Sequence, residues 1–406
     1  MLKSGGAAIL MIKNKVEYLF GTEDIKIVPL VPFDDKICNF LDALSKALRE
    51  EKDAKKYSDI ITFAFWIRKA NLMKMKEEYR DELRLGKGLV FHIAPSNVPI
   101  NFAYTFVFGF LSGNSNIVKA SSKRFPQTKL ICKVMQKVAE QQEYHWVKQQ
   151  NAIIIYDKEE TAYTEYFSKQ CDVRVIWGGD HTIQEVRKFP MQSRSTEMTF
   201  ADRYSFAIIS AAAILERKEM DLANLAEKFY NDTYLMDQNA CSSPHLICWM
   251  GEENEIKTAS ERFWFQVYQK VNRDYPLEDI KVSDKYTIAC EMAALGKIQQ
   301  LKTYGNFLYV SRISDLPDDV TQLRGKFGLF FEYRLRKLDE LSDIISKKVQ
   351  TCVVYGIEKE KISEWMVEKH VCGIDRIVDI GKTLEIGLLW DGYDVVRELS
   401  RIIKRW

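Results

Sequence analysis

Short apolar runs alternate with amphipathic stretches from Gly86 onward. Four largely apolar segments of four to six residues are each followed by a segment with helical periodicity: 89–94, 116–119, 152–156 and 173–177. The helical segments that follow them are 98–111, 128–141, 161–169 and 182–187. Successive strand–helix units predict a parallel, doubly wound α/β sheet. Such a sheet binds its ligands at the carboxyl ends of its strands.

A second set of apolar strands is expected at 205–210, 245–250, 307–310 and 351–356. An amphipathic helix over 221–229, with Asp221 as its expected N-cap, precedes the second of these strands. Helical periodicity also marks 37–49 and 59–79. We therefore predict four segments, with the last packing back on the first α/β domain or forming an oligomer contact. They are a helical N-terminal lead-in (1–85), two α/β domains (86–204 and 205–370) and a C-terminal return segment (371–406).

Composition and charge exclude several classes of protein. The chain has 46% apolar and 29% charged residues, which is typical of a globular enzyme. Its net charge of +2 argues against nucleic acid as the main ligand, because nucleic-acid-binding proteins usually have a strongly basic face. The run 98–111 is too short for a transmembrane segment and predicts a buried helix, while the run 7–12 is shorter than a signal-peptide core. Eight cysteines without a CxxC pair indicate reduced thiols and a cytoplasmic location.

Cys241 lies where the predicted helix ends and the next apolar strand begins. A thiol held at such a junction can attack a carbonyl and later be expelled, as covalent catalysis requires. A lone cysteine is also commonly a small buried residue, so the position alone leaves both interpretations open. The chain contains no GxGxxG, the usual dinucleotide-binding fingerprint.

Three further features and Cys241 together resemble the aldehyde dehydrogenase superfamily in order and spacing. They are an asparagine that follows a strand and opens a helix, a lysine on the next strand that contacts the cofactor ribose, and a small-residue turn beneath the cofactor phosphates. With the nucleophile, the matching residues are Asn97, Lys119, Gly178, Gly179 and Cys241.

Within that superfamily the chain resembles the LuxC-type fatty acyl-CoA reductases, which make long-chain aldehydes for bacterial luciferase. The likeness covers about 86–406, and its more specific segments are 237–244, 328–335, 374–381 and 390–394. The resemblance implies an aldehyde-dehydrogenase-like fold in which 86–204 binds a nicotinamide cofactor and 205–370 carries Cys241. It also implies a fatty acyl-CoA or acyl-protein substrate, an acyl-protein synthetase as partner, and a homo-oligomer.

The resemblance implies catalytic roles for three residues. The Cys241 thiolate would attack the acyl thioester, and the Asn97 amide and the Cys241 backbone N–H would donate to the carbonyl oxygen. Asn97 could instead be only a helix cap. His181 is the candidate proton donor, and a surface histidine is the alternative.

The cofactor contacts implied by the resemblance follow the strand at 116–119 and the glycine pair. Lys119, Ser121 and Ser122 would contact the cofactor, although Lys119 could be a solvated strand end. The glycine pair 178–179 could simply permit a tight turn. NAD-preferring members tend to carry a glutamate where this chain has Ser122, and Lys123 follows it. A site that lacks the glutamate and has a lysine beside it can accept the 2′-phosphate of NADPH, so we expect NADPH as the cofactor.

A departure from the family pattern bears on the reaction. Oxidising members use a glutamate followed by Leu-Gly-Gly to activate water, whereas the aligned stretch 200–205 contains no glutamate. A thioester on Cys241 would then await hydride or another thiol, which favours acyl reduction. The alternatives are a short-chain CoA-acylating aldehyde dehydrogenase, an acyl-phosphate reductase, and a cysteine acyltransferase without nicotinamide. No metal is expected, because His245 and Cys248 would point to opposite faces of a strand.

Overall fold

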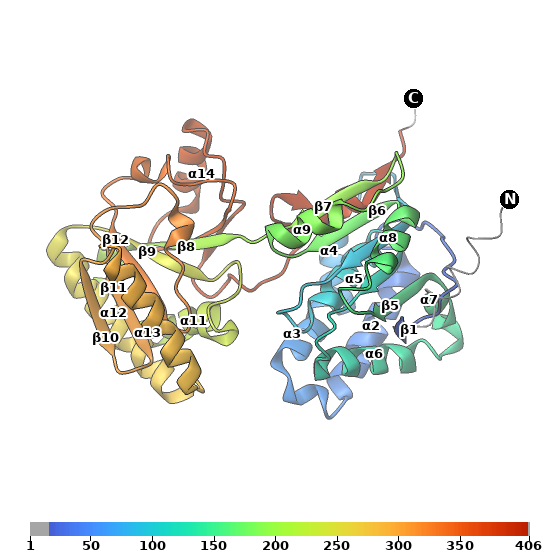
Figure 1. Cartoon of the computed structure of the whole chain (residues 1–406), viewed down its shortest axis with the longest axis horizontal. Coiled ribbons are helices and arrows are strands. Elements are labelled where there is room, and N and C mark those ends of the chain that lie inside the picture. The colour runs from blue at the N-terminus through green and yellow to red at the C-terminus, as the bar shows by residue number, and fades with distance from the viewer. Residues whose placement is uncertain (1–15, 405–406) are drawn as a thin grey trace. The chain divides into compact units, whose positions relative to one another are not determined.

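The computed structural model describes residues 16–404, which fall into two compact units (Figure 1). Within these residues, unit 1 combines 16–201 with 393–404, and unit 2 is Asp202–Gly392. The apolar run 7–12 lies outside the described residues. Among residues 16–404, no helix is both long enough and apolar enough to cross a membrane. The four predicted segment boundaries stay predictions.

Unit 1 contains a six-stranded sheet with the order β1-β5-β4-β3-β6-β7. Every neighbouring pair is parallel except β1 with β5. From β3 the chain builds outward through β4 and β5, and then adds β6 and β7 on the other side of β3. Doubly wound sheets bind ligands where the order reverses in this way, here between β3 and β6. The strands are β1 (Glu17–Phe20), β3 (Leu89–Ile93), β4 (Ser115–Lys119), β5 (Asn151–Ile155), β6 (Val173–Trp177) and β7 (Thr196–Phe200).

Helices cover both faces of this sheet, which confirms the predicted doubly wound α/β class. One face is covered by α8 (Thr161–Gln170) and α9 (Asp180–Arg187). The other is covered by α5 (Asn101–Leu111), which is apolar and buried on all sides, as the sequence predicted. The outer helices of unit 1 are α2 (Asp35–Glu50), α3 (Ser58–Trp66), α4 (Lys69–Lys76), α6 (Pro126–Val138) and α7 (His145–Gln150). The helical character predicted over 59–79 is confirmed, and the chain divides it into α3, α4 and a 3-10 turn.

A small antiparallel sheet joins two distant parts of unit 1. Its strands are β2 (Arg84–Gly86) and β17 (Ser400–Ile402), and α15 (Val395–Leu399) precedes β17. The buried Arg84 donates through Nε to Ser400 Oγ at 2.7 Å and through Nη2 to the Arg397 carbonyl at 2.8 Å. Unit 1 is therefore completed by residues that follow unit 2 in the chain.

Unit 2 contains a seven-stranded sheet with the order β10-β11-β12-β9-β8-β13-β14, parallel except between β10 and β11. The strands are β8 (Tyr204–Ser210), β9 (Pro244–Met250), β10 (Gln300–Tyr304), β11 (Leu308–Arg312), β12 (Leu329–Arg334), β13 (Val349–Tyr355) and β14 (Arg376–Asp379). One face packs on α10 (Ala211–Leu215), α11 (Glu219–Thr233) and α12 (Glu253–Asp274). The other packs on α13 (Asp279–Ala294) and α14 (Lys359–Glu368).

The segment before β9 positions Cys241. Helix α11 starts at Glu219 with Lys218 at the cap position, so the prediction that Asp221 caps it was wrong. Asp221 lies in the first turn, where its negative charge suits the helix dipole. A 3-10 turn and a short loop follow α11, and β9 starts at Pro244. Cys241 therefore lies at a helix-to-strand junction, as predicted.

Candidate active site

The carboxyl ends of three neighbouring strands bring the predicted cofactor residues of unit 1 to one edge of its sheet. Ile93, the last residue of β3, pairs with Lys119 on β4 and with Ile176 on β6. Asn97 follows β3 after a short loop, and Gly178 directly follows β6. These residues therefore surround the point where the strand order reverses.

Asn97 lies in the loop between β3 and α5 with its side chain exposed. Helix α5 starts at Asn101, and the residue at its cap position is Ile100, which makes no side-chain cap bond. Both the helix start expected at residue 98 and the alternative that Asn97 caps this helix were therefore wrong. The exposed amide at a strand end is available to a ligand.

Lys119 is almost completely buried, with 9% of its surface exposed. Its Nζ lies 4.9 Å from the centroid of the Tyr156 ring, a cation–π distance. Burial lowers the pKa of the Lys119 amine, and the charges of Asp157 and Glu159 oppose that shift. The alternative that Lys119 is a solvated strand end was wrong.

The residues after β4 form a polar turn. Ser121 is buried, and its Oγ accepts the backbone N–H of Lys123 at 3.1 Å. The side chains of Ser122 and Lys123 are both exposed. The turn thus presents a cation and a hydroxyl at the carboxyl edge of the sheet, and it contains no carboxylate.

The glycine pair connects β6 to the first turn of α9. Gly178 donates its N–H to the Phe200 carbonyl at 3.1 Å, and Gly179 occupies the cap position of α9 with φ −66°. A Cβ on Gly179 would meet nothing within 4 Å. Open space before a helix N-terminus, with backbone N–H groups directed into it, suits a phosphate. These residues fit a dinucleotide cofactor, although Asp180 adds a negative charge to the same turn.

His181 lies in the first turn of α9 with its side chain exposed. Lys188, and more weakly His181, lower the pKa of the nearby Glu185 carboxyl. A proton-donor role for His181 stays a prediction.

A buried polar network in unit 1 was missed in the sequence. His92 on β3 contacts Thr105 Oγ1 through Nδ1 at 2.8 Å and Asn116 Oδ1 through Nε2 at 3.1 Å. Trp177 Nε1 donates to the same Thr105 hydroxyl at 3.0 Å, and Asn116 donates to Asn151 Oδ1 at 2.8 Å. Burial lowers the pKa of His92 to about 4, so this ring is neutral. The network fixes Trp177 immediately before the glycine pair.

The Cys241 thiol in unit 2 is half-buried. Ser205 on β8 donates its hydroxyl to the Cys241 carbonyl at 2.7 Å. No group within residues 16–404 accepts the Cys241 backbone N–H, so this donor is available to a substrate oxygen. Burial raises the pKa of the thiol, and the backbone N–H of Arg203 opposes the shift by donating to the sulfur. The thiol form therefore predominates before a substrate binds.

Charged residues from three distant segments gather near Cys241. Asp391 and Asp202 raise the pKa of the thiol further, and Arg324 lowers it. Arg203 forms ion pairs with Asp375, through a short contact, and with Asp391, at 3.8 Å between Nη1 and Oδ1. The Asp391 carboxyl is nearly buried and also accepts a short hydrogen bond from Gln350. The family resemblance had marked the segments 374–381 and 390–394, which contain Asp375 and Asp391, but it gave these carboxylates no role.

His245 and Cys248 on β9 do not show the predicted opposite orientation, because His245 packs on Tyr204, a member of the same apolar cluster as Cys248, and the register between β8 and β9 shifts beside His245. Cys248 belongs to the apolar cluster beneath α13 and α14. The His245 ring stacks on Tyr204 with 5.3 Å between ring centroids, and burial lowers its pKa to about 3. Among residues 16–404, no three His, Cys, Asp or Glu side chains lie close enough together to hold a metal ion.

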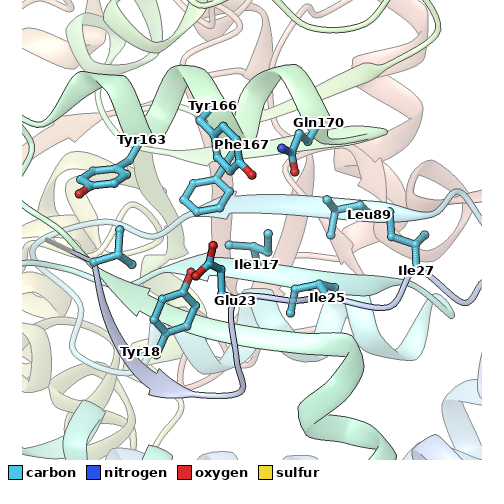
Figure 2. A pocket seen from close by; sticks show the side chains of 11 residues that line it. Tyr18, Glu23, Ile25, Ile27, Leu89, Ile117, Tyr163, Tyr166, Phe167 and Gln170 are labelled. Atoms are coloured by element: carbon cyan, nitrogen blue, oxygen red, sulfur yellow. The ribbon is translucent and has the colours of Figure 1, made fainter. Parts of the chain in front are cut away.

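A separate pocket of about 100 Å³ lies between α8 and the segment that follows β1 (Figure 2). Leu89, the first residue of β3, and Gln170, the last of α8, both line it. It is therefore nearer the amino ends of the strands than the predicted cofactor edge. None of the predicted site residues lines this pocket. Its walls are mainly apolar and aromatic, with Glu23 beside Tyr18.

Comparison with known families now identifies the chain. A model of the family described as Acyl-CoA reductase (LuxC) matches residues 26–307. The chain belongs to this family. The matched segment of this LuxC-family protein contains all of the residues that sequence analysis singled out as catalytic or cofactor-binding.

Curated relatives of this LuxC-family protein include a long-chain acyl-protein thioester reductase of Vibrio harveyi. It is 23% identical over 327 residues, which cover 78% of this chain and 63% of the relative. A protein of the same name from Aliivibrio fischeri is 23% identical over 184 residues, or 44% of this chain and 36% of the relative. The chain thus spans less than two thirds of each of these proteins.

Solved structures show the same fold at low identity. Aldehyde dehydrogenase 21 from Physcomitrella patens matches with a TM-score of 0.65 and 11% identity, covering 91% of this chain and 85% of that one. A 1-pyrroline-5-carboxylate dehydrogenase from Thermus with bound NAD matches with a TM-score of 0.61 and 13% identity, covering 92% and 81%. The predicted aldehyde-dehydrogenase-like fold is confirmed.

Proposed function

We propose that this LuxC-family protein reduces a long-chain fatty acyl thioester to the aldehyde with NADPH, through an S-acyl intermediate on Cys241. The observation that carries the proposal is a half-buried thiol in a helix-to-strand loop inside the segment matched by the family model. The relatives named as long-chain acyl-protein thioester reductases support the acyl class.

In the first step, the Cys241 sulfur attacks the thioester carbonyl. The bond to the donor sulfur breaks, and the donor leaves as a thiol with the proton that Cys241 gives up. Because the pKa of Cys241 is raised by its burial, substrate binding or a base must assist this proton transfer. The Cys241 backbone N–H and the Asn97 amide are the proposed donors to the negative carbonyl oxygen.

In the second step, the S-acyl group is reduced. The nicotinamide cofactor, when bound, supplies the hydride for the acyl carbon. Hydride addition leaves a negative charge on the oxygen of the tetrahedral adduct on Cys241. The carbon–oxygen double bond then re-forms as the carbon–sulfur bond breaks, which releases the aldehyde, and the Cys241 thiolate takes one proton from solution to regenerate the thiol. His181 is the proposed proton carrier. The stretch 200–205 offers no glutamate to direct water at the S-acyl group, which supports reduction over hydrolysis.

The residues proposed to hold the cofactor are Lys119, Ser121, Ser122, Gly178 and Gly179. Their support is the shared carboxyl edge of the sheet and the open space at Gly179. The exposed Lys123 next to Ser122 supports NADPH, because a cation there attracts a 2′-phosphate. Lys123→Glu is expected to shift the ratio of NADPH to NADH kcat/KM toward NADH by about tenfold. An unchanged ratio would leave NADPH preference without support.

The deciding experiment supplies the purified protein with NADPH and, in separate assays, myristoyl-CoA, butyryl-CoA or butyryl phosphate. We expect loss of the reduced-nicotinamide absorbance with myristoyl-CoA, together with an acylated Cys241 peptide when NADPH is omitted. Faster reduction of butyryl-CoA would indicate a short-chain acylating dehydrogenase, and activity only with an acyl phosphate would indicate an acyl-phosphate reductase. Acylation of Cys241 without any nicotinamide oxidation would indicate an acyltransferase.

We further propose an acyl-protein synthetase as partner, a homo-oligomeric assembly and a cytoplasmic location. The word acyl-protein in the names of the relatives supports the partner. All eight cysteines are free, which supports a reducing compartment. Co-purification with a synthetase and light scattering would test the partner and the assembly.

A further inference from the structure

Helix α13 of unit 2 carries a lysine in the protein interior. Lys285 has 0% of its surface exposed, and its Nζ donates to the Asn306 carbonyl at 2.5 Å and to the Phe327 carbonyl at 2.9 Å. The same Nζ lies 4.8 Å from the centroid of the Tyr309 ring. Within the described residues no carboxylate pairs with it, and a buried ammonium group without one is unfavourable. The two hydrogen bonds from Lys285 to backbone carbonyls therefore compensate for its burial, and they fix the backbone segments that carry those carbonyls.

One of those carbonyls belongs to a strained loop that leads into β12. Phe327 has φ 54° and Gly328 has φ 90°, both in the left-handed region. Phe327 pays a conformational penalty there that glycine avoids. A Cβ on Gly328 would lie 2.3 Å from the Tyr234 hydroxyl, so the close packing also requires glycine. Such a conformation persists only when neighbouring contacts fix it.

The neighbouring contacts come from the loop that carries Cys241. Asp237 and Gln238, with φ 52° and 61°, form a second pair of left-handed residues. Phe327 donates its N–H to the Asp237 carbonyl at 3.3 Å, and Gly328 donates to Gln238 Oε1 at 3.1 Å. These hydrogen bonds stabilise both pairs of left-handed residues, Asp237 with Gln238 and Phe327 with Gly328.

Gln238 attaches the same loop to the sheet. Its side chain is 1% exposed, and Nε2 donates to the Leu329 carbonyl of β12 at 3.0 Å. One turn before Lys285, Lys281 donates to Asp237 Oδ1 at 3.1 Å. Helix α13 therefore binds both loops, and Gln238 joins them three residues before Cys241.

We propose that Lys285 and Gln238 are positioning residues that fix the Cys241 loop in the geometry required for acyl transfer. Lys285 acts through the Phe327 carbonyl, and the Gln238 side chain acts through the N–H of Gly328. The catalytic consequence rests on the proposed function, whereas the positioning of the thiol does not.

Removing the hydrogen bonds of Lys285 or Gln238 is expected to raise the accessibility of the Cys241 thiol and to lower the rate of acyl reduction. The thiol becomes more accessible to water and to small alkylating agents, because its burial is lost. Acyl reduction becomes slower, because a misplaced nucleophile no longer meets the carbonyl in line. Substitution of a residue that only adds stability lowers the fraction of folded protein. In the molecules that remain folded, it changes neither the accessibility of the thiol nor the rate of acyl reduction.

The experiment measures alkylation of Cys241 by iodoacetamide in the full chain, with the exposed Cys290 and Cys372 replaced by serine. Lys285→Met keeps the length of the side chain and removes its donors. In the folded protein we expect alkylation at pH 7.5 to rise about three- to tenfold and its pH midpoint to fall, while kcat for acyl reduction falls about tenfold or more.

Lys302→Met is the matched control, since Lys302 also lies over a tyrosine ring but pairs with the surface carboxylate Glu261. It should leave the alkylation rate unchanged. Gln238→Met is the second variant and decides the question if Lys285→Met does not fold. An unchanged alkylation rate and pH midpoint in a folded Lys285→Met or Gln238→Met protein overturns the proposal. If the parent protein reduces no acyl thioester, the proposed function fails while alkylation still tests the positioning.

Discussion

Units 1 and 2 are both largely parallel sheets with helices on two faces, yet they place their candidate chemistry at opposite ends of their strands. In unit 1, Asn97, Lys119 and Gly178 lie at or just past the carboxyl ends of β3, β4 and β6. In unit 2, Cys241 lies just before the amino end of β9. A doubly wound sheet offers its carboxyl edge to ligands through its own topology. A nucleophile at the other edge needs side chains such as Gln238 to fix its loop.

Two polar clusters, the His92 network of unit 1 and the charged groups near the thiol of unit 2, also differ in their charge. The buried network of unit 1 is neutral and joins His92, Asn116 and Asn151 across three strands. Unit 2 instead uses charged groups, with Arg203 bound to two carboxylates near the thiol and Lys285 inside the fold. Charges near a sulfur alter its protonation, whereas neutral amides only fix geometry. The contrast predicts that substitutions in unit 2 act on reactivity and those in unit 1 act on stability or ligand contact.

The largest expected effect tests whether Cys241 is the reactive group of unit 2. Cys241→Ser should lower acyl-thioester reduction at least about 1000-fold, because a hydroxyl is a far weaker nucleophile and leaving group than a thiol. Circular dichroism and the thermal midpoint should stay at the parent values. Cys290→Ser, which alters an exposed thiol on α13, is the control and should keep full activity. Substantial turnover by Cys241→Ser would contradict the assignment of Cys241 as the nucleophile.

A second test uses the neutral histidine of unit 1. The folded pKa of His92 is about 4, below the ordinary value of 6.5, so the unfolded chain binds more protons between these values. Stability should therefore fall by up to about 3 kcal/mol as the pH drops from 6.5 to 4, with no contribution from this group above 6.5. Urea unfolding across this pH range measures the slope. His92→Gln should flatten it, and an equally steep slope in that variant would contradict the neutral network.

A third test separates ligand contact from helix capping in unit 1. Asn97→Ala should lower kcat about 10- to 100-fold, because one proposed oxyanion donor is removed while another remains. Its stability should not change, since Asn97 does not cap α5. The matched variant is Asp34→Ala, which removes a true cap on α2, where Asp34 Oδ1 accepts the Lys36 N–H at 2.9 Å. That variant should cost about 1 kcal/mol and leave kcat unchanged. The reverse outcome would show that Asn97 is structural.

The smallest expected effect concerns the charged cluster of unit 2. Asp391→Asn removes a negative charge that raises the pKa of Cys241, so the thiol should ionise at lower pH. Alkylation of Cys241 at neutral pH should then increase about two- to fivefold. Asp339→Asn, a surface carboxylate beside Lys369, is the control. Slower alkylation in Asp391→Asn would instead identify Asp391 as the base that accepts the thiol proton.

Apolar strands were the most predictable part of the fold. β3, β5 and β8 are almost wholly buried, and their residues are apolar apart from His92, Asn151, Ser205 and Ser210. β7 was missed because its sequence, Thr-Glu-Met-Thr-Phe, alternates and is partly exposed. The break between α3 and α4 was not predicted because neither glycine nor proline marks it, and the two residues between the helices are Ile67 and Arg68.

The candidate site was only partly predictable. Cys241 and Lys119 could be found because motifs mark them locally. Arg203 and Asp391 meet only through the fold, and no spacing rule joins residues so distant in sequence. Lys285 did leave a signal, because helical periodicity puts it on the same buried face as Ala289 and Met292. A lysine in such a position indicates an interior role.

The pairing of β2 with β17 has a consequence for synthesis at the ribosome. Unit 2 is one uninterrupted stretch of chain, so all of its strands are synthesised before residues 393–404. The pairing of β2 with β17 can form only after residues 400–402 have been made, because Arg84 binds Ser400. The first unit to be translated is therefore the last to be finished.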